Sequence, residues 1–218
     1  MKSPIEYIKQ AISIYTQKEN FIFFAKIMAV LTIVATLLGL LMGYLYPADV
    51  YETLDFSNLA YTMGFIVLSL IVSIFGVFVR STTLVSVINT GGDVKGVFGI
   101  GYKKIWKYLI VTMVVGLIVF LGGLLLIIPG IMFAVWFSFS TLLVIDKELK
   151  VKEALRQSKE MVSGRFWKVL GRFFVFGLFV IVVAVIFDYI PYAGSIIVSF
   201  LSPLFILPSY LLYKDLTV

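Results

Sequence analysis

Three cations are the residues whose type and position best suit specific chemistry, because each lies in or beside a long uncharged stretch: Lys26, Arg80 and Arg172. Arg80 follows 24 uncharged residues, and apolar sequence continues after it to Ile88. A cation inside a membrane is energetically costly and usually functional, which is one interpretation of Arg80. The alternative is that the apolar segment ends near Arg80 and that the side chain extends to the interface. Together the three cations would form a basic ring suited to an anionic lipid headgroup, unless each reaches the interface independently.

The residues that usually carry catalysis and metal binding are missing. The chain has no His and no Cys, which removes the usual general base near neutral pH, the commonest metal ligand and thiolate chemistry. We therefore expect no enzyme activity, no metal and no cofactor. An intramembrane enzyme, the remaining alternative, would rely on Ser, Thr, Tyr, Lys or interfacial carboxylates, and the sequence contains no visible pairing of a nucleophile with a base.

The composition of the chain is that of a membrane protein. Hydrophobic residues make up 61% and charged residues 14% of the 218 residues, against about 45–50% and roughly 25% in soluble domains. Uncharged stretches of 22, 24 and 38 residues follow Lys26, Asp55 and Lys107. Because a spanning helix needs about 20 residues, the sequence predicts an all-α, polytopic membrane protein that forms a single domain over residues 1–218.

The longest uncharged stretches must fold back on themselves. A straight helix of 38 residues would be about 57 Å long, against a hydrocarbon core of about 30 Å. Because proline and glycine break helices, we expect hairpin turns at Pro47, at Pro129 and Gly130, and at Pro191. The sequence thus predicts six transmembrane helices in three hairpins, near 21–46, 58–86, 105–128, 130–147, 166–189 and 194–213.

The basic residues lie on one side of this arrangement. All 18 Lys and Arg fall on the side of the N-terminus and of the connections 87–104 and 148–165, or within about two turns of it. By the positive-inside rule both termini are cytoplasmic, and we expect a multi-pass protein of the plasma membrane. The net charge of +6 then requires no nucleic-acid partner. Aromatic and basic neighbours are expected as interfacial anchors: Trp106, Lys107, Trp167 and Lys168.

Each predicted hairpin follows a segment with the apolar periodicity of an amphipathic helix. Ser3, Pro4 and Glu6 form a capping box with proline at the first helical position. Apolar stripes with helical spacing run through 93–105 and 150–164, and such helices lie in the headgroup layer on the cytoplasmic side. The pattern predicts three internal repeats, 3–86, 93–147 and 150–214. The alternative is that cytoplasmic connectors are amphipathic without being related.

Three short sequences occur in a distinctive order: IIPGI at 127–131, EALRQS at 153–158 and GRFWKVL at 164–170. They resemble the membrane domain attached to some bacterial glycerophosphodiester phosphodiesterases, and related free-standing six-helix membrane proteins of bacteria and archaea. The resemblance covers roughly residues 120–175. It implies a membrane anchor or accessory domain without chemistry of its own. The phosphodiesterase barrel would need about 250 residues and a catalytic His, so we extend the resemblance to the fold and not to the activity.

The expected function is that of a non-catalytic membrane protein, an accessory module that organises lipids, anionic lipids among them, or binds a partner. Small residues at Ala35, Gly39 and Gly43 favour close helix packing, either inside the bundle or with a second copy or another membrane protein. A transporter or channel for an anionic or lipidic substrate is the alternative. No carboxylate lies clearly at mid-membrane depth to couple a cation, whereas Arg80 remains to bind an anion.

Overall fold

A computed structural model describes residues 1–46, 59–190 and 193–217, and these residues form helices and no strand. The helices are α1 (Pro4–Thr16), α2 (Lys18–Leu45), α4 (Leu59–Ile88), α5 (Val94–Leu125), α6 (Ile127–Trp136), α7 (Ser140–Asp146), α8 (Val151–Ser163), α9 (Phe166–Asp188) and α10 (Ala193–Thr217). The prediction of an all-α protein is confirmed for this part of the chain.

Six helical segments are long and apolar enough to cross a membrane, as predicted. They are Lys18–Leu45, Leu59–Ile88, Val94–Leu125, Ile127–Asp146, Phe166–Asp188 and Ala193–Thr217. The shortest has 20 residues, which corresponds to about 30 Å of helix and matches the hydrocarbon core. The hairpin turns predicted at Pro47 and Pro191 lie outside the described residues.

The break between the third and fourth of these segments lies at Leu126, before the Pro129 and Gly130 of the prediction. Leu126 is extended and separates α5 from α6. Pro129 lies in the first turn of α6, where its missing amide donor is not needed. A Cβ atom on Gly130 would lie 2.9 Å from the Cα of Gly123 on α5. Gly130 therefore permits the close approach of the two helices and does not form the turn.

Two of the three predicted amphipathic segments are separate helices. α1 begins with the predicted capping box, in which the Glu6 amide donates to the Ser3 hydroxyl at 3.3 Å and the Ser3 amide donates to the Glu6 carboxylate at 2.8 Å. Residues 150–164 form α8 and its C-cap. Residues 93–105, however, continue into the third span as the first part of α5. No glycine or proline occurs between residues 102 and 115, so nothing ends the helix at the boundary expected near residue 105.

One face of each of these segments packs against protein, and their predicted place in the headgroup layer stays a prediction. α1 packs on α10, the first part of α5 packs on α4, and α8 packs on α6 and α7. The buried positions are Tyr7, Ala11 and Tyr15 in α1, Val97, Gly101 and Ile105 in α5, and Ala154, Ser158 and Val162 in α8. The protein core therefore includes one face of each segment, while other side chains such as Ile5 and Ile12 of α1 are exposed.

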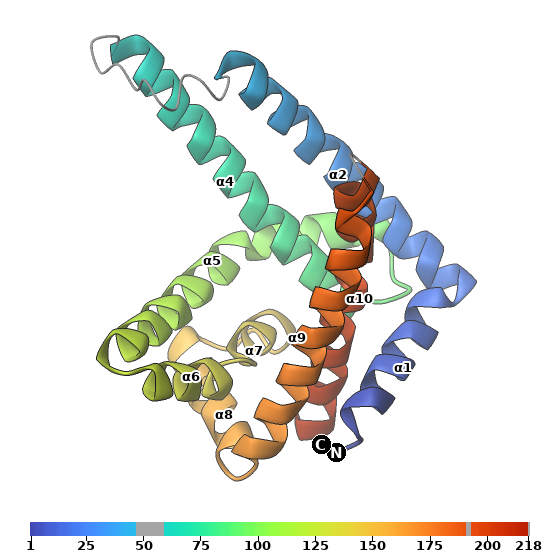
Figure 1. Cartoon of the computed structure of the whole chain (residues 1–218), viewed down its shortest axis with the longest axis vertical. Coiled ribbons are helices and arrows are strands. Elements are labelled where there is room, and N and C mark those ends of the chain that lie inside the picture. The colour runs from blue at the N-terminus through green and yellow to red at the C-terminus, as the bar shows by residue number, and fades with distance from the viewer. Residues whose placement is uncertain (47–58, 191–192, 218) are drawn as a thin grey trace.

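Most buried side chains gather at one end of the helices, which we call the base. The base comprises α1, α7, α8, and residues 23–31, 81–87, 97–105 and 204–213. Beyond it the helix pairs α2 and α4, α5 and α6, and α9 and α10 extend as three arms, and the two termini lie together (Figure 1). The arms expose apolar side chains such as Leu40, Leu70, Leu124 and Ile186, which gives them a surface suited to lipid.

The fourth candidate span is interrupted in the base by a turn at residues 137–139, between α6 and α7. Such a break leaves backbone groups without helical partners, and these groups need other partners when they are buried. Ser158 of α8 supplies them: its hydroxyl donates to the Trp136 carbonyl at 2.7 Å and accepts from the Phe139 amide at 3.2 Å. α8 therefore stabilises the break as well as covering it.

Candidate functional site

An open cavity of about 440 Å³ lies where the base ends of the arms meet. Its walls come from α4, α5, α7 and α10 and from the turn before α7. Arg80 is the charged residue in its lining, and the hydroxyl residues around it are Thr83, Tyr108, Ser138, Thr141, Ser202 and Ser209. The other lining residues are apolar, among them Leu84, Phe205 and Ile206. The cavity thus combines one permanent cation with hydroxyls and hydrocarbon.

Arg80 is not at the end of its helix, since α4 continues for eight residues to Ile88. Its side chain is exposed, while residues 81–87 immediately after it are buried. Within the described part of the chain, no hydrogen bond or ion pair engages the guanidinium. A guanidinium has five N–H donors and is charged at all physiological pH values. Arg80 therefore offers its full donor set to a group in the cavity.

The other two cations of the predicted ring are elsewhere. Lys26 is exposed on α2 and does not line the cavity. Arg172 on α9 donates to backbone carbonyls: its Nε and Nη2 bond the Lys2 carbonyl at 3.1 and 2.6 Å, and its Nη1 bonds the Lys168 carbonyl at 2.7 Å. These contacts fix the N-terminus. The structure therefore leaves Arg80 as the cation of the cavity and brings neither Lys26 nor Arg172 to it.

The N-terminal helix is held to the last helix by specific polar contacts. The Tyr7 hydroxyl donates to the Asp215 carboxylate at 2.6 Å and accepts from the Lys2 amide at 3.1 Å. Burial and the hydrogen bond to Asp215 raise the pKa of Tyr7 to about 12. Tyr15 donates to the Phe200 carbonyl of α10 at 2.9 Å. These contacts join α1, at the start of the chain, to α10, at its end.

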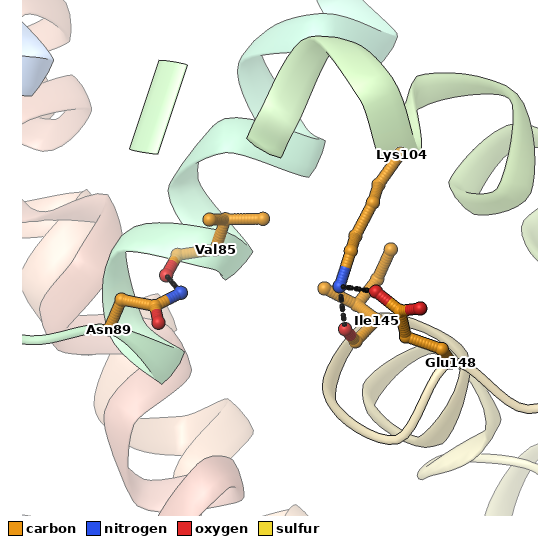
Figure 2. A network of polar contacts seen from close by, with 5 residues as sticks. All are labelled: Val85, Asn89, Lys104, Ile145 and Glu148. Carbon is orange, nitrogen blue, oxygen red and sulfur yellow. Dashed lines mark hydrogen bonds and ion pairs between the residues drawn. The ribbon is translucent and has the colours of Figure 1, made fainter. Parts of the chain in front are cut away.

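A second polar contact joins α5 to the end of α7 (Figure 2). Lys104 donates to the Ile145 carbonyl at 2.6 Å and forms an ion pair with Glu148 at 2.9 Å. A cation suits this place because the last carbonyls of a helix lack partners. The hydrogen bond and charge of Lys104 lower the pKa of Glu148. This contact fixes α7, whose Thr141 and Leu142 line the cavity.

The predicted interfacial anchors Trp106, Lys107, Trp167 and Lys168 are all exposed. Their interfacial role stays a prediction. The small-residue face of α2 is not packed inside the described chain, because a Cβ atom at Gly39 or Gly43 would meet nothing within 4 Å. No group of three or more carboxylates placed to hold a metal occurs among residues 1–46, 59–190 and 193–217.

Sequence reasoning missed the hydroxyl residues of the cavity. The second helix of each predicted hairpin contains a serine three residues before an apolar pair: Ser81 before Leu84 and Val85, Ser140 before Leu143 and Val144, and Ser209 before Leu212 and Tyr213. Of these three serines, Ser209 lines the cavity and the other two do not. The apolar pairs are all buried in the base. Serines and threonines are ordinary in spanning helices, so the sequence does not single out those that line the cavity.

No model of a known protein family, no curated protein and no solved structure matches this chain. The resemblance to the membrane domain of glycerophosphodiester phosphodiesterases stays a prediction.

Proposed function

We propose that this chain is a non-catalytic, multi-pass membrane protein that holds the anionic group of an amphiphile beside Arg80. The observation that carries the proposal is the placement of an unpaired guanidinium in a cavity of about 440 Å³ lined by hydroxyls and hydrocarbon. Guanidinium binds phosphate and carboxylate through paired N–H donors. Hydroxyl groups can complete the coordination of the same oxygens, and the apolar lining suits the remainder of an amphiphile.

The test is the retention of anionic lipid by protein extracted gently from its membrane, measured by native mass spectrometry. Arg80→Gln should lose about tenfold or more of the adduct, because a charge-assisted hydrogen bond contributes about 1.5–3 kcal/mol. Lys26→Gln is the matched control, since Lys26 is an exposed cation outside the cavity. An unchanged adduct in Arg80→Gln, or an equal loss in both variants, would show that the cavity beside Arg80 does not hold the anionic lipid.

We also infer that both termini face the cytoplasm and that the membrane is the plasma membrane. Two observations support this orientation: the termini lie together beside the base (Figure 1), and the exposed Lys152 and Lys168 belong to the same end. The absence of native Cys makes single-Cys variants clean probes. In intact cells an impermeant thiol reagent should label Asp188→Cys, at the far end of α9, and should not label Lys152→Cys. The opposite pattern would invert the orientation.

We further infer that the chain consists of three related units that close into a ring. The buried residues support this through a common register: they lie four, eight and twelve residues after the N-caps Ser3, Asp93 and Lys150. The central position is small in each unit, namely Ala11, Gly101 and Ser158. The first segment of each unit packs on the second helix of another, α5 on α4, α8 on α6 and α7, and α1 on α10. The Arg80 cavity lies among these second helices.

A further inference from the structure

A groove of about 300 Å³ runs between α2 and α10 on the arm side of the Arg80 cavity. Its lining carries no charge and consists of Ala29, Thr32, Ile33, Thr36, Leu37 and two residues of α10, Ile196 and Phe200. Ile33, Leu37 and Ile196 are exposed, so the groove is open toward the surroundings of the arms. In a membrane those surroundings are lipid chains.

A smaller hollow of about 140 Å³ lies between the groove and the Arg80 cavity. Thr32 lines both the groove and the hollow, while Val79 and Ser202 line both the hollow and the cavity. The three spaces therefore follow one another along α10, from Ile196 to Ser209. The helix rises about 20 Å between these two residues, which is enough to cross one hydrocarbon leaflet of about 15 Å.

We propose that the anionic group held at Arg80 belongs to a lipid, and that the hydrocarbon chain of this lipid lies in the groove between α2 and α10. This inference rests on the proposed function, because it needs an anion at Arg80. The cavity alone would suit a free phosphate as well as a headgroup. An uncharged groove that follows the cavity and the hollow along α10 and opens toward the arms favours a ligand with a polar end and an apolar end. The lipid then lies with its head at the base and its chain along α10.

The experiment uses the full chain and a phosphatidic acid that carries a photoactivatable diazirine in its acyl chain. After irradiation, peptide mass spectrometry locates the label. In the wild type we expect labelling concentrated in residues 28–37 and 196–202. Arg80→Gln should abolish this concentration, because the headgroup is no longer held. Thr32→Trp should also abolish it, because its indole fills the point shared by groove and hollow. Val34→Trp is the matched control, since Val34 is exposed on the same helix and lines neither space.

A second probe, glycerol 3-phosphate, separates a lipid from a soluble anion. Thr32→Trp should still bind glycerol 3-phosphate, which also shows that the variant is folded, while it loses the labelled lipid. Labelling spread evenly over all arms, or unchanged in Thr32→Trp, would overturn the groove assignment and leave anion binding at Arg80 intact. Labelling and glycerol 3-phosphate binding that both persist in Arg80→Gln would overturn the proposed function itself.

Discussion

The base and the arms both carry large apolar side chains, and the base alone buries most of them inside the protein. In the base, Phe139, Leu143 and Tyr213 are fully buried by neighbouring helices, and the turn after Trp136 finds its backbone partners in Ser158. In the arms, side chains of the same kind, such as Leu40 and Leu124, are exposed. The comparison teaches that hydropathy identifies helices that can enter a membrane, whereas helix packing decides where the protein has a core of its own.

The largest expected difference between the two regions is in the effect of truncating a leucine. Leu143→Ala removes a side chain with 0% exposure and should lower the free energy of unfolding by about 2 to 5 kcal/mol. Leu40 is 66% exposed, and Leu40→Ala should change the free energy of unfolding by less than about 0.5 kcal/mol. Denaturant unfolding in detergent micelles measures both. Equal losses would show that the arms are packed as tightly as the base.

A smaller effect is expected from adding one methyl group at a helix contact. In Gly101→Ala the new Cβ atom would lie 3.1 Å from the Cα of Thr82 on α4, so α4 must shift, at a cost of about 1 to 3 kcal/mol. In Gly99→Ala the methyl group meets nothing within 4 Å, and alanine favours helix by about 1 kcal/mol over glycine. The thermal midpoint should therefore fall in the first variant and be unchanged or higher in the second. A lower midpoint in Gly99→Ala alone would contradict the packing of α5 on α4.

The smallest effect concerns pH and the contact between Lys104 and Glu148. The hydrogen bond and charge of Lys104 hold the pKa of Glu148 below its ordinary value of 4.5. The unfolded chain therefore takes up this proton more readily than the folded chain does. The stabilisation is complete above pH 4.5 and is lost as the pH falls through the lowered value.

Wild type should thus have a higher thermal midpoint than Glu148→Gln at pH 7, and the difference should shrink in acid. In a Lys104→Met background the Glu148→Gln change should produce a smaller pH-dependent difference, because only the charge of Lys107 then lowers the pKa of Glu148. A difference of undiminished size would assign the effect to a partner other than Lys104.

The sequence was sufficient for features that depend on local chemistry. Uncharged length predicts the spanning segments, and the residues Ser3, Pro4 and Glu6 predict the start of α1. Features that depend on contacts between distant residues were not predictable in this way. Arg172 lies near the start of an apolar segment, where a ligand-binding cation could also lie. Its bonds to the Lys2 carbonyl depend on where the N-terminus lies, which the sequence does not show. The dipeptide Pro129-Gly130 predicts a turn when it is considered alone. Gly130 instead allows the tight packing of α6 on α5, which the dipeptide by itself does not reveal.

The most direct test of the account is an experimental structure of the protein in nanodiscs that contain phosphatidylglycerol. We expect density for a lipid phosphate within hydrogen-bond distance of the Arg80 guanidinium, with chain density along α10 between Ser202 and Ile196. Lipid ordered elsewhere around the arms, with Arg80 paired to a protein carboxylate or with its cavity closed by side chains, would contradict it.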